Sequence, residues 1–287
     1  MTVSRRAAVL VLVGIACRAV PCAAQAVAAV TPPALSPQEM ETFLLHAPIV
    51  ATKKSASAGT TGARRVTLSD GRTTHDAQIQ DVDIQKPFFD VAPRYAEINF
   101  KDTYRYNIAA YRLSRLLGLE EVPMSVPRTV DGKPAAVTWW IDDVIMDEGT
   151  RQQKKVASPS PSRTASYTLI LRVFDELIQN RDRNAGNLLW TSDWKMWMID
   201  HTRAFRSAHT LIKPQALQRC ERTLLDRMRV LTAASVTEGV GGMLMKDEIE
   251  ALMARRDALV KLFDARIAQR GEKAVLYTLS RREEPGR

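Results

Sequence analysis

Cysteine is scarce in this chain of 287 residues, which contains only three. Two of them, Cys17 and Cys22, lie within the first 24 residues, so the rest of the chain keeps Cys220 alone. A single cysteine cannot build an intramolecular disulfide framework. The sequence also shows no cysteine and histidine spacing of the kind that holds zinc. It therefore excludes a disulfide scaffold and argues against a zinc protein.

Long hydrophobic runs are also missing. The longest N-terminal run, residues 7–17, has eleven apolar residues and is too short to span a bilayer. It follows Arg5 and Arg6 and leads into small residues up to Ala24, which is the pattern of a cleaved signal peptide. We expect export and a mature chain without a membrane span. The alternative is an uncleaved N-terminal membrane anchor.

Aromatic residues make up 6% of the sequence and do not alternate with the basic residues. The formal net charge of +9 falls to +6 after cleavage, because the first 24 residues hold three arginines and no acid. Scattered basic charge without aromatic partners is not typical of nucleic-acid-binding modules. The composition, 45% hydrophobic and 25% charged, is that of an ordinary globular protein. We therefore expect no nucleic-acid partner.

The first half of the chain is predicted to form an antiparallel sheet with one helix. Strands are expected at 48–52, 65–68 and 75–82, with a turn at Asp70-Gly71. Residues 104–118 place their leucines on one helical face. The apolar segment 135–146 is predicted to be one buried strand.

The second half is predicted to be mainly helical. Residues 149–165 are polar and contain two prolines, which indicates a connector between two lobes. The segment that follows carries an apolar stripe of helical period, and further helices are expected at 214–231 and 246–268. The predicted fold class is α+β, with a signal peptide at 1–24, a lead-in at 25–48, an N-terminal lobe at 49–147, a helical C-terminal lobe at 148–280 and a tail at 281–287.

A predicted hairpin carries the most informative polar residues. Its strands, 188–190 and 194–199, are joined by a turn at 191–193. Because a hairpin brings the outer ends of its strands together, Asn187 and Asp200 should meet at its open end. Asp182 lies on the loop that leads to the same end. Oxygen donors of this kind suit Mg²⁺ or Mn²⁺.

The segments DRNAGN and MIDHTRAF resemble the catalytic and metal-binding loops of atypical kinases. The families concerned are the type II phosphatidylinositol 4-kinases, the HipA-type toxin kinases and the secretory-pathway family of the Golgi casein kinase. The segments FDELIQNRDR and NIAAYRLSRLLGLEEVP resemble the last family especially. The resemblance covers roughly residues 50–205.

This resemblance implies a two-lobed kinase-like fold that transfers the γ-phosphoryl group of ATP to a hydroxyl acceptor. It makes Asp182 the catalytic base and gives the metal to Asn187 and Asp200. The implied nucleotide-binding residues are Gly59, Thr60, Thr61 and Gly62 over the phosphates and Ile141, Asp142 and Asp143 in the interlobe hinge beside adenine.

Two residues of the kinase pattern are absent. Kinases carry a lysine on the third strand that contacts the phosphates, yet Gln78 or Gln80 stands there. The helix glutamate that would pair with this lysine is replaced by Asn107. A cation from elsewhere would then make the phosphate contact, and the candidates are Arg64, Arg65 and Lys101.

The leading prediction is an exported, metal-dependent phosphotransferase that acts on a hydroxyl of a protein, glycan or lipid. The missing lysine and glutamate favour an alternative, a catalytically inactive kinase-like module that binds a partner. A third reading keeps the fold and the metal but transfers a nucleotidyl group.

Overall fold

The structure is a computed structural model that describes residues 35–53, 63–92 and 95–280. The chain divides into two compact units, Met1–Leu35 and Ser36–Arg287, and the described elements belong to the second. The predicted signal peptide, the segment Gly59–Gly62 and the predicted tail lie outside the described residues.

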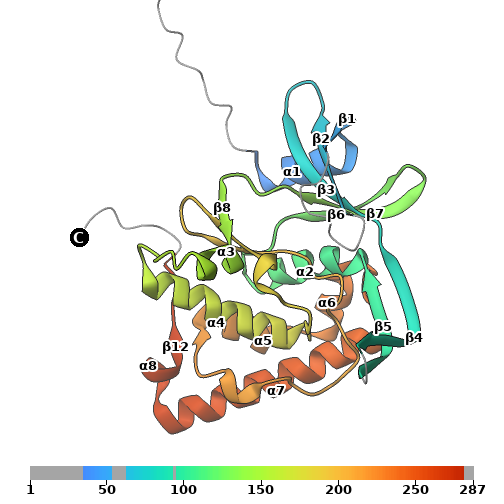
Figure 1. The fold of residues 1–287 in the computed structure, drawn as a ribbon. Helices are drawn as coiled ribbons and strands as arrows, with labels where there is room; N and C mark the ends of the chain where they lie inside the picture. Colours follow the sequence, from blue (N-terminus) through green and yellow to red (C-terminus); the bar gives the residue numbers. More distant parts are fainter. Residues whose placement is uncertain (1–34, 54–62, 93–94, 281–287) are drawn as a thin grey trace, which may run out of the picture. The chain divides into compact units, whose positions relative to one another are not determined.

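An antiparallel sheet of five strands forms the N-terminal part of this unit (Figure 1). Its strand order β1-β2-β3-β7-β6 is set by hairpin connections and by the return of β7 beside β3. The strands are β1 (Ile49–Lys53), β2 (Arg64–Ser69), β3 (Thr74–Gln80), β6 (Ser125–Val130) and β7 (Lys133–Trp139).

The helix α1 (Pro37–His46) covers the apolar face of the sheet, where alternate residues such as Val66, Ile79 and Val137 are buried. Ser36 begins the helix with a capping box, because its hydroxyl accepts from the backbone N of Glu39, whose carboxylate accepts from the backbone N of Ser36. The predicted lead-in therefore ends in an ordered helix.

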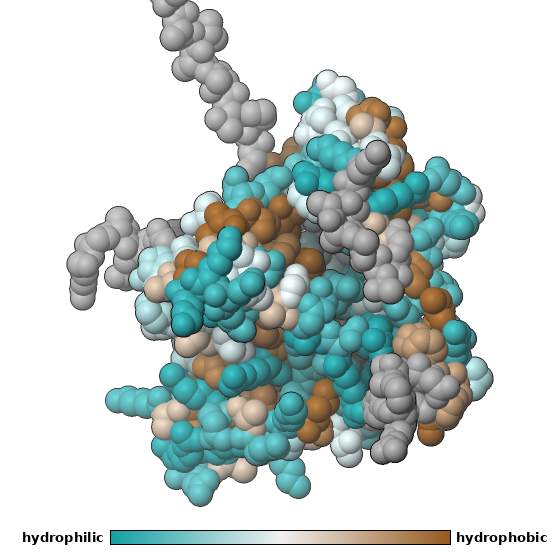
Figure 2. Space-filling model, viewed as in Figure 1, coloured by the Kyte–Doolittle hydropathy of each residue, from teal (hydrophilic) through white to brown (hydrophobic). Residues whose placement is uncertain are grey.

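The helix α2 (Arg105–Leu116) packs on β6 and β7 and confirms the helical periodicity of this segment. Before it comes a hairpin that the sequence did not reveal, β4 (Asp83–Ala92) and β5 (Tyr95–Thr103). Ile84, Phe88 and Ile98 are exposed on this hairpin. Figure 2 shows hydrophobic atoms at the right of the view, where β4 and β5 lie in Figure 1.

The predicted strand 135–146 is broken in the structure. β7 ends at Trp139, and β8 (Val144–Asp147) begins a second sheet of order β10-β9-β8 with the predicted hairpin β9 (Leu188–Thr191) and β10 (Met196–Met198). Asp143, just before β8, has a φ of 55°. This left-handed residue turns the chain out of one sheet and into the other.

The C-terminal part is mainly helical, as predicted, and its core is a large cluster of buried leucines, methionines and aromatic rings. The predicted connector contains a short helix at its beginning, and the helix predicted over 214–231 starts only at Arg222. The helices are α3 (Glu148–Gln153), α4 (Pro161–Leu177), α5 (Arg222–Val230), α6 (Ala233–Val240), α7 (Lys246–Arg270) and α8 (Glu272–Val275), with 3-10 turns η1 (Ala185–Asn187) and η2 (Pro214–Ala216) and the short strands β11 (Cys220–Glu221) and β12 (Leu276–Tyr277).

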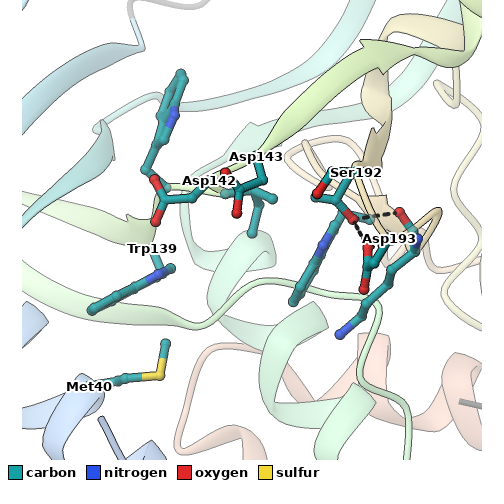
Figure 3. A pocket seen from close by; sticks show the side chains of 11 residues that line it. Met40, Trp139, Asp142, Asp143, Ser192 and Asp193 are labelled. Atoms are coloured by element: carbon teal, nitrogen blue, oxygen red, sulfur yellow. Dashed lines mark hydrogen bonds between the residues drawn. The ribbon is translucent and has the colours of Figure 1, made fainter. Parts of the chain in front are cut away.

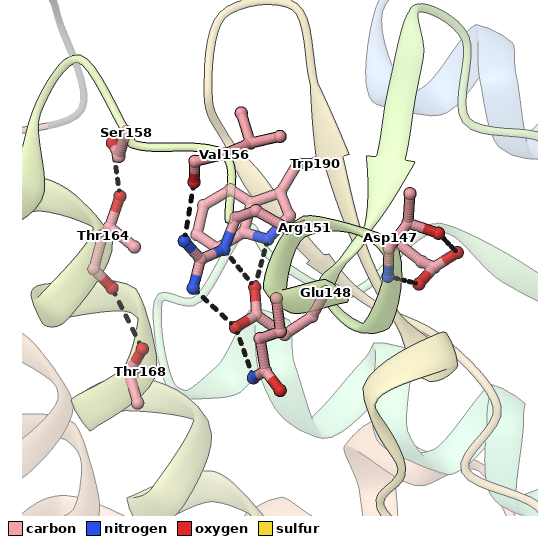
Figure 4. A network of polar contacts seen from close by, with 10 residues as sticks. Asp147, Glu148, Arg151, Val156, Ser158, Thr164, Thr168 and Trp190 are labelled. Atoms are coloured by element: carbon pink, nitrogen blue, oxygen red, sulfur yellow. Dashed lines mark hydrogen bonds and ion pairs between the residues drawn. The ribbon is translucent and has the colours of Figure 1, made fainter. Parts of the chain in front are cut away.

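The carboxylate of Glu148 attaches α3 to the hairpin (Figure 4). It accepts hydrogen bonds from Arg151 at 2.6 Å and from the indole of Trp190 at 2.8 Å. Trp190 is 1% exposed, so this bond joins a surface helix to the core. Asp147 caps the same helix by accepting from the backbone N of Thr150.

Among the described residues, no helix is both long enough and apolar enough to cross a membrane.

Candidate active site

The open end of the hairpin β9–β10 is held together by Arg183. Its guanidinium donates to the carbonyl of Ile199 at 2.7 Å and reaches the carbonyl of Asn187 at 3.5 Å. The same side chain is paired with Asp175 at 3.0 Å, and both groups are nearly buried. Because the backbone N of Ile199 also donates to Asn187, the residues around the two predicted metal ligands are fixed in register.

The three predicted site residues lie on the segments expected for them. Asp182 is half exposed in the loop between α4 and η1, and Asn187 ends that turn. Asp200 is exposed directly after β10 with a φ of 54°, a left-handed conformation that aspartate tolerates. Its carboxylate accepts a hydrogen bond from the hydroxyl of Thr202 at 3.1 Å.

Asp102, at the end of β5, is a fourth oxygen donor that sequence reasoning missed. It is 6% exposed, and its Oδ1 has no hydrogen-bond partner among the described residues. Burial raises its pKa, and the charges of Asp200 and Asp182 raise it further, whereas Thr202 and Arg203 act in the opposite direction. The charges of these three carboxylates therefore repel one another, and a bound cation would reduce this repulsion.

Arg203 is a cation near these carboxylates, and its partner Glu97 is also paired with Arg206. The guanidinium of Arg203 lies 3.1 Å from Asp182 and 3.1 Å from Glu97, and it is 5.0 Å from the ring of Phe100. Sequence reasoning missed this role because Glu97 is more than a hundred positions away in the chain. The only available signal was the arginine in the segment IDHTRAF, three residues after Asp200.

The backbone after Asp200 is attached to α2 and β5. Asn107 accepts a hydrogen bond from the backbone N of His201 at 2.8 Å, and the backbone N of Thr103 donates to the carbonyl of Thr202 at 2.9 Å. His201 is buried, and both this burial and the charge of Arg183 hold its pKa well below the usual range. The imidazole is therefore neutral at physiological pH.

Gln80 occupies the buried inner end of β3, where it is 3% exposed. Gln78 lies two residues before it, on the same face of the strand. Within the described part of the chain, the Oε1 of Gln80 has no hydrogen-bond partner. The sheet thus presents a neutral amide at the buried position.

The three cations predicted for the phosphate contact are all engaged by carboxylates outside the Asp182–Arg203 pair. Arg64 is paired with Asp131, and Lys101 is paired with Glu248. Arg65 donates from Nε to Asp76 at 2.6 Å and lies 4.1 Å from the ring of Trp140.

The hinge residues line a cleft between the end of β7 and the turn of the hairpin (Figure 3). Its volume is about 480 Å³. The Oδ2 of Asp142 lies 2.6 Å from the Nε2 of His75 as the acceptor of this contact, and the imidazole stacks on Trp139. Asp182, Asn187 and Asp200 are not among the residues that line the cleft. The lining residues are Met40, Trp139, Trp140, Ile141, Asp142, Asp143, Thr191, Ser192, Asp193, Lys195 and Trp197.

The donors at the hairpin end fit a hard cation, since they are oxygens and include the unpartnered Oδ1 of Asp102. In the part of the chain that the structure describes, no three His, Cys, Asp or Glu side chains form a metal-binding group. Magnesium at nucleotide sites takes one or two carboxylates and completes its shell with phosphates and water. The two predicted metal ligands, Asn187 and Asp200, would match that limited number of protein donors.

No family model and no curated protein matches the chain. Solved structures do. The structure of hydra Fam20 with sugar superposes with a TM-score of 0.63 at 14% identity, covering 84% of this chain and 92% of that one. The Golgi casein kinase with Mn/ADP bound gives a TM-score of 0.56 at 14% identity, covering 87% and 80% of the two chains.

A further crystal structure of the Golgi casein kinase gives a TM-score of 0.55 at 14% identity, over 83% of this chain and 77% of that one. At this identity the likeness establishes the fold. It confirms the predicted α+β, two-lobed arrangement, and the chain therefore has an atypical kinase-like fold.

Proposed function

We propose that this protein is an exported, metal-dependent phosphotransferase that moves the γ-phosphoryl group of ATP to a hydroxyl acceptor. The observation that carries the proposal is the hairpin end, where Asn187 and Asp200 flank strands tied together by Arg183, with Asp182 on the adjoining loop. The similarity to a Golgi casein kinase that holds Mn and ADP supports nucleotide and metal use.

In this mechanism Asp182 orients the acceptor hydroxyl and accepts its proton as the bond to phosphorus forms. Half of its side chain is open to solvent, so an acceptor can reach it. Asn187 and Asp200 would hold Mg²⁺ or Mn²⁺, which when bound supplies positive charge against the phosphate oxygens. Asp102 adds a buried carboxylate behind Asp200.

The nucleoside end of ATP is assigned to the hinge. Ile141, Asp142 and Asp143 lie outside regular strands, between β7 and β8. Gly59 to Gly62 stay predicted as the phosphate-covering loop and lie outside the described residues. The acceptor class, protein, glycan or lipid, is left open.

A kinase-like binding module without catalysis is the second candidate, and one observation favours it. Gln80 is buried where the kinase lysine is expected, and Asn107 bonds to the backbone of His201 in place of a glutamate–lysine pair. The chain has thus lost both charges of that pair together, which avoids an unpaired buried charge.

The function is tested with Asp182→Asn and Asp200→Asn proteins, incubated with ATP, Mn²⁺ and a panel of protein, glycan and lipid acceptors. We expect a fall of about 10²–10⁴-fold in phosphoryl transfer for D182N with little change in ADP binding. D200N should lose transfer and also lose metal-dependent ADP binding, because it removes a metal donor.

Intact-mass measurement of the acceptor separates a phosphoryl adduct from a nucleotidyl adduct. Asp226→Asn, an exposed acidic residue on α5, serves as the matched control. Folded D182N and D200N proteins that transfer phosphate at the wild-type rate would rule out this mechanism. No transfer by the wild type, with nucleotide binding retained, would favour the binding module.

A further inference from the structure

Phosphoryl transfer needs a positive side chain against the nucleotide phosphates, and this fold does not provide one from β3. The buried end of β3 carries Gln80, whose amide Oε1 is unpartnered within the described residues. A neutral amide cannot offset the charge of a triphosphate. If the protein binds ATP, a cation from another element has to approach the phosphates.

The three cations predicted from sequence are poorly placed for that task. Arg64 is paired with Asp131 in the β6–β7 turn. Arg65 is held over Trp140 by Asp76. Lys101 points into a separate cavity of about 350 Å³, where Glu248 binds it.

Arg203 is placed differently, because it lies on the same turn as a predicted metal ligand. The backbone N of Ala204 donates to the carbonyl of His201 at 3.0 Å, so Thr202 and Arg203 are the central residues of a turn that begins next to Asp200. The Arg203 Nη1 is 3.1 Å from Asp182, the predicted base. A phosphate between the base and the metal ligands would therefore lie beside this guanidinium.

The guanidinium of Arg203 is also oriented by neighbouring side chains, and some of its N–H groups remain without an acceptor in the described part of the chain. Glu97 accepts from its Nη2 at 3.1 Å and is also paired with Arg206, and the guanidinium lies 5.0 Å from the centre of the Phe100 ring. Its Nε is buried and has no hydrogen-bond partner among the described residues, so the donors open to a ligand are the remaining N–H groups of Nη1 and Nη2. An arginine has five N–H donors, so it can keep its carboxylate contact and still bind a phosphate oxygen.

The orientation depends on Asn99, which has a φ of 54°. In a regular strand Glu97 and Phe100 would face opposite sides. The left-handed residue between them resets the alternation, so that both are buried while Ile98 is 74% exposed. The strand therefore delivers a carboxylate and a ring to the same guanidinium.

We propose that Arg203, held by Glu97, is the phosphate-binding cation of this protein and replaces the absent lysine–glutamate pair with an arginine–glutamate pair from other elements. The inference rests on the proposed function. It assigns to Arg203 contact with the phosphate groups of a nucleoside di- or triphosphate, and to Glu97 a positioning role.

The test is calorimetric titration of the purified chain with ADP plus Mn²⁺ and, separately, with adenosine. The variants are Arg203→Gln and Arg203→Met, of which the second keeps an apolar stem near Phe100. Arg222→Gln, an exposed arginine paired with Glu272, is the matched control. We expect R203Q and R203M to bind ADP about tenfold or more weakly while adenosine binding stays unchanged.

The readout is the ratio of the ADP affinity to the adenosine affinity. A purely structural role of Arg203 would leave this ratio unchanged, because a distorted site binds both ligands more weakly. Glu97→Gln should lower the same ratio by a smaller factor. Wild-type and R203Q proteins with equal ADP affinity would overturn the assignment of Arg203 and leave the proposed function standing. A wild-type chain that binds neither ligand would overturn both.

Discussion

At the residue scale, the site depends on side chains that hold backbone rather than substrate. Arg183 secures the carbonyls at the hairpin end, and Asn107 secures the N–H of His201. A buried N–H without an acceptor costs free energy, so these contacts stabilise the loop that carries Asp200. The positions of the reactive groups follow from these neighbours.

We expect Asn107→Ala to lower the free energy of unfolding by about 1–3 kcal/mol, because the His201 N–H is left without its acceptor. Asn107→Asp keeps an acceptor oxygen and should retain most of the stability. Urea denaturation of the three proteins checks both expectations. An N107A protein as stable as the wild type would mean that water or another group satisfies this N–H.

Sequence reasoning located Asp182, Asn187 and Asp200 on their loops because the hairpin around them is local in the chain. It could not locate Asp102 or Arg203, since their partners come from distant segments. Arg203 was read as part of the motif IDHTRAF and not as a charge that needs a carboxylate.

At the element scale, the sequence predicts helices and strands that have a regular hydrophobic period. It misses elements that depend on capping residues or on contacts with distant segments. α2 and the hairpin β9–β10 follow their hydrophobic patterns closely. The helix α3 has no buried residue and is instead capped by Asp147 and attached through Glu148, so no apolar stripe announces it. The β4–β5 hairpin exposes apolar residues such as Phe88, so its sequence lacks a clear alternation of apolar and polar residues.

The contact of α3 with the hairpin predicts a pH dependence. Hydrogen bonds from Arg151 and, more weakly, from Gln152 and Trp190 lower the pKa of Glu148 from 4.5 to about 2, against the opposing effect of burial. The folded state therefore favours the ionised carboxylate. Its contribution is complete above pH 4.5 and is lost as the pH falls toward 2.

At pH 7 we expect Glu148→Gln to be less stable than the wild type by about 2–3 kcal/mol. The difference should shrink steadily below pH 4.5 and vanish near pH 2. Chemical denaturation across this pH range measures it. Glu272→Gln, at an exposed ion pair, is the control. An E148Q deficit that does not change with pH would place the effect in packing.

At the scale of the whole molecule, the order of the predicted elements and the resemblance to atypical kinases predict the fold class, and the solved structures confirm it. The predicted division at 147 and 148 falls between β8, which pairs with β9, and α3, and it stays a prediction. Export, the mature N-terminus and the glycine-containing loop concern segments outside the described residues and stay predictions.

Nucleotide binding by the whole protein is measured by thermal melting with and without ATP and Mn²⁺. At a ligand concentration of 100 times Kd, binding adds about 2.7 kcal/mol to the free energy of unfolding. We expect a clear rise in Tm for the mature chain and a smaller rise for Asp200→Asn. An unchanged Tm at millimolar nucleotide would favour the non-catalytic binding module.

The hydrogen bond from Thr103 to Thr202 has a mechanical consequence. It connects the end of β5 to the turn that carries Arg203. Glu97, on the same strand, accepts a hydrogen bond from the guanidinium of Arg203. The exposed side chains of Phe88 and Ile98 lie on the same hairpin, and Ile98 is the neighbour of Glu97 in β5. A displacement of this hairpin would therefore move both Glu97 and the turn that carries Arg203.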